Sequence, residues 1–286
     1  MRNTFSSHVN FTPKWQCVAA AGLALMGSAL ATRAQAQAFL LAPTRLIFDG
    51  PTRAQELIIM NQSDRQQTYR LRLEDRQIRD SGEYDVVAEA TSATAAAPLI
   101  RLSAKQFIVP PRESATLRVL LRKPSGLADG EYRSHIVVTE LPLVDAPTID
   151  SSPKDGIDIR ITPVFSISIP VIVRVGTTTS KVSVSDVSRA PAEGAPNLDI
   201  VRLILSSVGN RTAFVDVNLV SARDRRAKPV AAAKAIAIYY PINRRVFNLP
   251  LNQEQTAAVR AGGVVLQYQE VDKDGNLLGA PVEVAL

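Results

Sequence analysis

The side chains that most often carry out enzyme chemistry are sparse along this chain of 286 residues. Beyond residue 36 there is one histidine, His135, in the alternating run 132–139, and the only cysteine of the sequence is Cys17. The sequence has no Gly-x-Ser-x-Gly elbow, paired-cysteine metal motif or glycine-rich phosphate loop. His135 is therefore interpreted as a structural strand residue. We predict no enzyme, and expect no catalytic residue, no metal and no cofactor.

Carboxylates remain as candidates, because 27 acidic residues leave open a pair suited to glycoside hydrolysis. No spacing singles out such a pair, so a hydrolase is the least favoured function. The net charge is +6, and half of it comes from Arg2, Lys14 and Arg33 near the N-terminus. So small a charge over the rest of the chain gives no reason to expect nucleic acid as a partner.

The N-terminus has the pattern of an export signal. Arg2 and Lys14 precede an apolar run at 17–31, and small-residue sites follow at 34–36 and 36–38. This order predicts a signal peptide at 1–36, cleaved after Ala36 or Ala38. The alternative is a membrane anchor, but the run is short for a bilayer. We expect a periplasmic protein with no stable membrane insertion.

Beyond the signal, the elements that must position any functional side chain are strands. Apolar and polar residues alternate with period two in segment after segment, with turn residues between them. Such segments lie at 69–74, 116–122, 132–139, 198–205, 214–219, 264–268 and 282–286. The pattern predicts an all-β fold of two immunoglobulin-like β-sandwich domains. A polar segment at 176–180 places the domains at 37–175 and 176–286.

Two details refine this prediction. Tyr132 follows Gly130 at the start of a strand, a spacing typical of the tyrosine corner of immunoglobulin-like domains, although an ordinary turn tyrosine is the alternative. The second detail is a long alternation from Ile157 to Arg174, interrupted by Pro163 and Pro170. Because proline cannot donate to a ladder, these positions predict a strand that lies partly on a sheet edge. The alternative is a buried strand followed, after a proline bend, by a second.

Several segments resemble PapD-like periplasmic pilus chaperones. They are Thr-Arg-Leu-Ile-Phe-Asp-Gly at 44–50, the segment 108–119, Arg-Lys-Pro at 122–124, Gly-Glu-Tyr-Arg-Ser-His at 130–135, Glu-Leu-Pro at 140–142, and the segments 237–241 and 244–251. The likeness covers nearly the whole chain beyond the signal. The Glu-Tyr-Arg-Ser-His signature and the long strand look most like the archaic, spore-coat-U-type branch.

The resemblance implies a chaperone that donates a β-strand to pilus subunits and delivers them to an outer-membrane usher. Strand donation by such chaperones is a known form of strand addition. The donor side chains would be Ile157, Ile159, Ile161, Phe165 and Ile167. For Phe165 to Val173, burial in the chain's own core is the alternative that we favour.

The resemblance also implies a basic anchor for the carboxylate at the C-terminus of the subunit. Arg45 falls on this position in the first motif, and a surface salt bridge is the alternative role. The family's second anchor, a lysine late on the long strand, is missing here. Arg174 and Arg133 are the candidates for it. A competing function is a secreted β-sandwich adhesion or carbohydrate-binding module, but no tryptophan lies beyond residue 36 to stack on a sugar.

Overall fold

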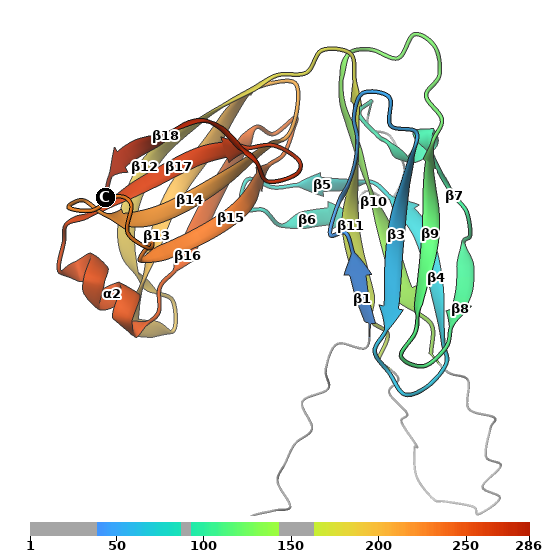
Figure 1. Ribbon diagram of the computed structural model, residues 1–286, viewed down its shortest axis with the longest axis horizontal. Helices are drawn as coiled ribbons and strands as arrows, with labels where there is room; N and C mark the ends of the chain where they lie inside the picture. Colours follow the sequence, from blue (N-terminus) through green and yellow to red (C-terminus); the bar gives the residue numbers. More distant parts are fainter. Residues whose placement is uncertain (1–38, 87–92, 143–162) are drawn as a thin grey trace, which may run out of the picture. The chain divides into compact units, whose positions relative to one another are not determined.

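The computed structural model describes residues 39–86, 93–142 and 163–286, and over these ranges the chain is all-β (Figure 1). The strands form two immunoglobulin-like β-sandwiches, one built from strands up to residue 175 and the other from strands after residue 179. The predicted fold class is therefore confirmed. The predicted signal peptide lies outside the described residues. Within the described ranges, no helix is long and apolar enough to cross a membrane.

The first sandwich packs a sheet of order β1–β3–β9–β7 against one of order β2–β11–β10–β4–β8. These strands are β1 (Phe39–Ala42), β2 (Leu46–Phe48), β3 (Ala54–Asn61), β4 (Gln67–Glu74), β7 (Ile100–Leu102), β8 (Gln106–Val109), β9 (Ser114–Leu121), β10 (Gly130–Glu140) and β11 (Ser166–Val175). Alternate apolar residues point inward, such as Leu57, Ile59, Leu117 and Val119, which are at most 3% exposed. Each such side chain contributes about 1.5–3 kcal/mol on burial, which explains a core without disulfides.

Tyr132 forms the predicted tyrosine corner. Its hydroxyl donates a hydrogen bond of 3.1 Å to the carbonyl oxygen of Ala128, and its side chain is largely buried. Two residues further on, the Ser134 hydroxyl accepts hydrogen bonds from the backbone N–H groups of Ala96 and Ala97, at 2.9 and 2.7 Å. A hydroxyl thus fastens the strand at the position where antibody domains have a cysteine.

The long alternating segment becomes strand β11 at Ser166. β10 pairs with β11 along its whole length, whereas β2 pairs with it only at Val171–Val173. On the side away from β10, Ser166–Pro170 therefore has no partner among the described strands. This part of β11 is a sheet edge, as the prolines indicate.

The position of Pro170 follows from the direction of its backbone. The Glu140 N–H donates to the Phe165 carbonyl oxygen at 2.9 Å, so the backbone N–H and carbonyl groups of Phe165 point toward β10. Because the direction of the backbone groups alternates along a strand, the N–H and carbonyl groups of the even-numbered residues of β11 point away from β10. The N–H that Pro170 lacks would point to the open side, and the β10 ladder loses no bond.

The second sandwich packs a sheet of order β12–β13–β16 against one of order β15–β14–β17–β18. Its strands are β12 (Ser180–Ala192), β13 (Ala195–Gly209), β14 (Ala213–Ser221), β15 (Ala231–Ile238), β16 (Arg244–Pro250), β17 (Val264–Val271) and β18 (Leu277–Ala285). Val201, Leu203, Leu205, Val217 and Leu266 are fully buried in its core. The strands predicted at 198–205, 214–219, 264–268 and 282–286 all belong to this sandwich.

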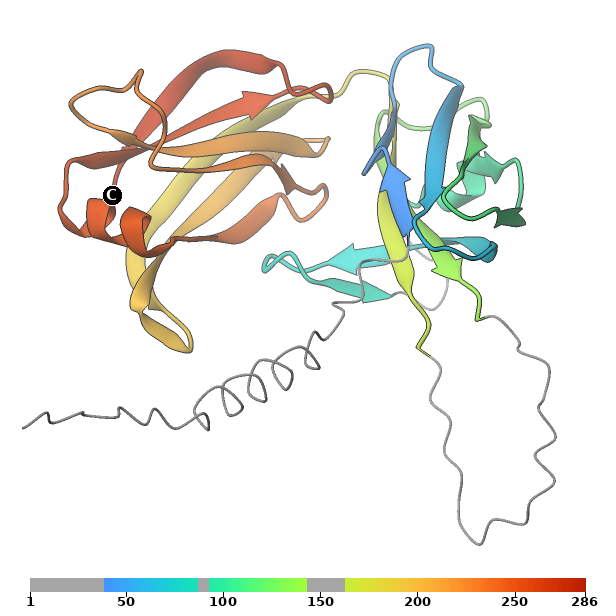
Figure 2. The ribbon, with the colours of Figure 1, turned by 60° about the horizontal axis from the view of Figure 1, so that its bottom comes forward.

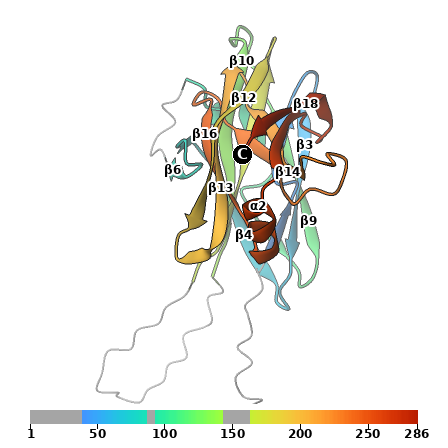
Figure 3. The same ribbon diagram turned by 90° about the vertical axis from the view of Figure 1, so that its left-hand side faces the viewer.

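One α-helix among the described residues was not predicted, namely α2 (Gln253–Arg260), which lies beside the strands of the second sandwich (Figure 3). Asn252 and Gln255 form a reciprocal capping box at its start. Arg260 at its end binds the buried Asp199 of β13 through two hydrogen bonds, of 3.0 and 2.7 Å. The helix therefore forms part of the connection from β16 to β17, and the Arg260–Asp199 pair holds its end against β13.

A hairpin of β5 (Arg76–Ile78) and β6 (Tyr84–Val86) runs out from the sheets of the first sandwich (Figure 2). The Val246 N–H of β16 donates to the carbonyl oxygen of Asp80 at the hairpin tip, at 2.7 Å. The Asp80 carboxylate also pairs with Arg244. The hairpin thus contacts strand β16 of the second sandwich through both the backbone and a side chain.

Candidate functional site

Arg45, the anchor that the resemblance implies, lies beside the open edge of β11. Because β2 runs parallel to β11 with Leu46 opposite Val171, the preceding residue, Arg45, comes next to Pro170. Leu46 is buried in the core of the first sandwich, so Arg45 points to the opposite face of the sheet. There its guanidinium carbon lies 4.3 Å from the centre of the Phe214 ring of β14.

Arg45 has no charged partner within the described part of the chain. No carboxylate there lies within ion-pair distance of its guanidinium, and no described residue forms a hydrogen bond with its side chain. The nearest acid in sequence, Asp49, pairs instead with Arg174 at 3.4 Å. Stacking on an aromatic ring orients a guanidinium but leaves its N–H donors free. Arg45 is therefore a positioned cation with unused hydrogen-bonding capacity.

An apolar cluster lies under this arginine. Ile47 of β2 and Ile172 of β11 pack with Phe214, Ala237 and Val271 of the second sandwich, and all five are less than 10% exposed. These contacts bury outward-facing residues of the first sandwich that would otherwise meet water. Packing in this cluster fixes the Phe214 ring on which the Arg45 guanidinium stacks.

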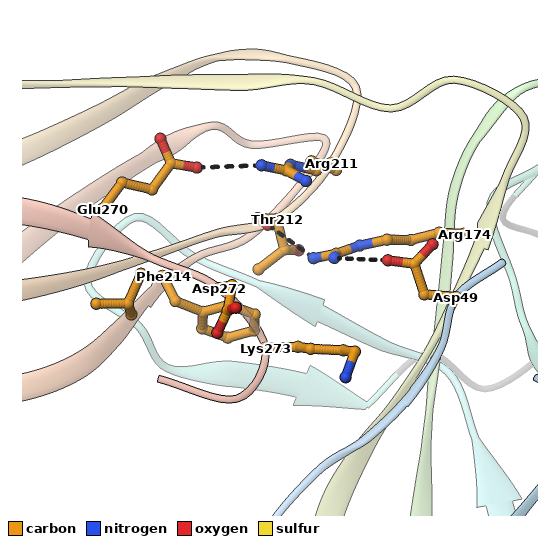
Figure 4. A pocket seen from close by; sticks show the side chains of 9 residues that line it. Asp49, Arg174, Arg211, Thr212, Phe214, Glu270, Asp272 and Lys273 are labelled. Atoms are coloured by element: carbon orange, nitrogen blue, oxygen red, sulfur yellow. Dashed lines mark hydrogen bonds and ion pairs between the residues drawn. The ribbon is translucent and has the colours of Figure 1, made fainter. Parts of the chain in front are cut away.

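Arg174 sits in a different environment, at a cavity of about 230 Å³ (Figure 4). Its Nε and Nη1 atoms lie 3.4 Å from carboxylate oxygens of Glu131 and Asp49, respectively, and its Nη2 lies 3.3 Å from the carbonyl oxygen of Thr212. Glu131, only 2% exposed, also accepts hydrogen bonds from the Thr212 N–H, at 2.9 Å, and from the Thr212 hydroxyl. Arg174 is thus committed to partners within the chain.

Arg133 is also bound within the chain. It donates a hydrogen bond of 3.2 Å to the carbonyl oxygen of Tyr240, and its guanidinium carbon lies 4.6 Å from the centre of the Tyr239 ring. Burial lowers the pKa of the Arg133 guanidinium. The structure therefore separates the three candidate arginines: Arg133 and Arg174 have internal acceptors, and Arg45 has none among the described residues.

His135 of β10 lies opposite Pro170 of β11, and Arg45 comes next to Pro170 on the other side, so the three residues lie side by side across the sheet. It is 2% exposed, and neither ring nitrogen has a hydrogen-bond partner among the described residues. The Tyr84 ring of β6 meets it edge-on, with 5.1 Å between the ring centres. Burial, with the nearby charge of Arg133, lowers the pKa of His135 to about 3. A neutral imidazole shielded from solvent agrees with the structural role interpreted from the sequence.

The predicted donor residues have different surroundings. Ile157, Ile159 and Ile161 lie outside the described residues. Phe165 is 50% exposed and Ile167 is half-buried, whereas the following odd positions, Ile169, Val171 and Val173, are buried in the core of the first sandwich. The favoured expectation of burial thus holds from Ile169 on, but not for Phe165. The reason is that Phe165 precedes the first residue of β11.

Comparison with family models and with curated protein sequences gives no match. Among solved structures, the chain is similar to the YadV chaperone, at 11% identity and a TM-score of 0.47 over 87% of this chain and 100% of that one. It is similar to the E. coli chaperone DraB, at 16% identity and a TM-score of 0.45 over 87% of this chain and 96% of that one.

A third similar structure is the CsuC–CsuE chaperone–tip adhesion subunit complex from archaic chaperone–usher Csu pili of Acinetobacter baumannii. Its matching chain has 13% identity and a TM-score of 0.42, over 87% of this chain and 99% of that one. The assignment of the fold rests on the two pairs of sheets described above. All three structures contain a chaperone, and the third comes from chaperone–usher pili.

Proposed function

We propose that this protein is a periplasmic chaperone that binds pilus subunits by donating an edge strand and delivers them to an outer-membrane usher. It acts by binding and not by catalysis. The observation that carries the proposal is the half-open strand β11, which β10 covers on one side while Ser166–Pro170 has no described partner on the other. A strand edge left open in a folded protein is a template for pairing with another chain.

The chemistry of the edge fits strand addition. The even-numbered residues of β11 turn their backbone groups outward, so Ser166 and Ser168 offer N–H and carbonyl groups to a partner. Main-chain hydrogen bonds give such pairing its affinity, and alternate side chains give it specificity. Phe165, which is half-exposed at the start of the edge, keeps the odd-numbered apolar pattern that the sequence has at 157–161.

We assign the anchor for the subunit's C-terminal carboxylate to Arg45. A planar guanidinium suits a carboxylate because two N–H donors meet two oxygens. Arg45 retains free donors, whereas Arg174 and Arg133, the other two candidates, already donate to Glu131, Thr212 and Tyr240. The domains at 37–175 and 176–286 and the signal peptide at 1–36 complete the proposal, since export brings the chain to the compartment where its subunits and usher meet.

The test is co-expression with candidate pilus subunits, followed by gel filtration, with the double variant Ile159→Glu/Ile161→Glu. The wild-type chain should elute in a one-to-one complex. The variant should lose it, because burying an unpaired charge in an apolar groove costs several kcal/mol. The matched control is Ile58→Glu, since Ile58 is 40% exposed on the other sheet of the first sandwich and should bind normally.

Circular dichroism separates the outcomes. A folded double variant that still forms the complex contradicts strand donation from 157–161. A double variant that does not fold would place these isoleucines in the chain's own core instead.

A further inference from the structure

A second open strand edge lies on the other side of the first sandwich, at strand β4. β8 pairs with β4 only at Gln67–Arg70, and the Leu71 N–H then donates to the carbonyl oxygen of Lys105 at 2.8 Å. Because the direction of the backbone groups alternates along a strand, the N–H and carbonyl groups of Leu73 point to the same side of β4 as those of Leu71. No described strand pairs with Leu73 there, and its N–H and carbonyl group are left open.

A cavity of about 470 Å³ lies at this open segment. Its apolar walls are Leu71 and Leu73 of β4 and Ile100 and Leu102 of β7, of which Leu71 and Ile100 are at most 3% exposed. These side chains belong to the inner faces of the two sheets. The cavity is therefore an entrance to the sandwich core between β4 and β7.

The charged residues that line this cavity all carry the same sign. They are Arg72, Arg101 and Lys105, and no acidic residue of the described part of the chain lines it. Arg72 pairs with Glu74, whereas Arg101 donates only to the carbonyl oxygens of Pro98 and Ile100. Among the described residues, no carboxylate pairs with Arg101 or Lys105. Two cations thus stand unneutralised beside an apolar cavity and an open strand edge.

We propose that this place, the β4–β7 groove, binds an extended segment of a partner polypeptide in which an apolar residue is flanked by aspartate or glutamate. The apolar side chain enters the cavity, the backbone pairs with Leu73, and the flanking carboxylates meet Arg101 and Lys105. The open backbone groups favour a peptide over a lipid, because an alkyl chain has no N–H or carbonyl group to pair with them. The groove lies apart from β11, so this proposal does not rest on the proposed function.

The test uses the full chain and an acetylated, amidated heptapeptide in which aspartate and leucine alternate. We expect saturable binding by NMR titration, with slowed hydrogen exchange at the Leu73 amide. The same peptide with lysine in place of aspartate should bind at least about tenfold more weakly, which corresponds to about 1.4 kcal/mol. A peptide N-methylated at the residues that face Leu73 should also lose binding, because it lacks the donors for strand pairing.

The variant Arg101→Glu/Lys105→Glu should weaken the aspartate–leucine peptide by about tenfold or more. The matched control is Arg223→Glu/Arg226→Glu, which changes the same charge on an exposed turn of the second sandwich. If the reversed variant does not fold, Arg101→Gln/Lys105→Gln removes both charges more gently and should still weaken binding.

Three results would overturn the proposal. The first is no saturable binding to the wild-type chain, and the second is equal binding by the variant and its control. The third is dodecanoate binding that displaces the peptide while the N-methylated peptide binds as well as the parent, since this would identify an anionic amphiphile as the ligand.

Discussion

The guanidinium of Arg45 stacks on the ring of Phe214, with 4.3 Å from the guanidinium carbon to the ring centre, and no described carboxylate neutralises it. The contact joins the loop before β2 to strand β14. A cation–π contact of this kind is worth about 0.5–2 kcal/mol, enough to orient the side chain but less than a desolvated ion pair. The arrangement presents a charge in a fixed place and leaves it available to a ligand.

Replacing Arg45 should therefore affect binding more than stability. Arg45→Ala should weaken subunit binding by about 2–5 kcal/mol, because one partner of a desolvated pair is removed. Arg45→Lys, which keeps the charge without the planar fork, should weaken it less. Arg118→Ala, on the exposed face of β9, is the control and should bind normally.

The deciding measurement is the affinity of wild type and Arg45→Ala for a subunit amidated at its C-terminus. Amidation should remove most of the difference between them. If amidation leaves the affinity intact while Arg45→Ala abolishes it, Arg45 acts through packing or on another ligand.

The buried pair of Glu131 and Arg174 should instead control stability. Glu131→Ala leaves Arg174, whose side chain is 6% exposed, without its buried partner, so the free energy of unfolding should fall by about 3–5 kcal/mol. Replacing both residues, as Glu131→Leu/Arg174→Met, should recover much of this loss, because no buried charge is left unpaired, and Asp49, whose side chain is 44% exposed, stays solvated. Urea denaturation measures both. A loss below about 1 kcal/mol in Glu131→Ala would show that solvent enters the site freely.

The alternation of apolar residues predicted the strands well because each sandwich buries one face of every sheet. The spacing of Gly130 and Tyr132, which are close in sequence, pointed to the tyrosine corner. The helix α2 carried a readable signal in its capping pair, Asn252 and Gln255, but eight residues are too few for an apolar stripe to stand out.

The assignment of roles to the arginines could not be made from the sequence. Arg174 is 125 residues from Asp49, 43 from Glu131 and 38 from Thr212, so only the folded chain shows that it is occupied. The same holds for the β4–β7 groove, whose walls come from separate strands. The resemblance implied that arginines among these three bind a carboxylate, and the tertiary contacts show which of them already donate to acceptors within the chain.

His135 should make stability depend on pH. Burial and the charges of Arg133 and Arg76 lower its pKa to about 3, against an opposing effect of Glu74, while in the unfolded chain the pKa is about 6.5. Between these two pKa values, His135 is therefore protonated in the unfolded state and neutral in the folded state. The His135 contribution is fully present above pH 6.5 and is lost as the pH falls toward 3.

For one proton, the slope in this range is about 1.4 kcal/mol per pH unit. Denaturant melts between pH 6 and 4, a window that lies between the two pKa values, should show it in wild type, and the non-titrating variant His135→Gln should have a slope smaller by about this amount. Parallel pH profiles of the two proteins would mean that His135 is protonated as readily in the folded state as in the unfolded one.

The tyrosine corner gives the last prediction. Tyr132→Phe keeps the ring but removes the hydroxyl that donates to the Ala128 carbonyl, so the free energy of unfolding should fall by about 0.5–1.5 kcal/mol. Tyr268→Phe is the matched control, because Tyr268 is as deeply buried, at 8% exposed, and its hydroxyl has no hydrogen bond to a described residue. The control should change stability by less than about 0.5 kcal/mol. Equal losses in the two variants would show that the corner hydrogen bond adds nothing beyond ring packing, and that β10 is held at this end by its core contacts alone.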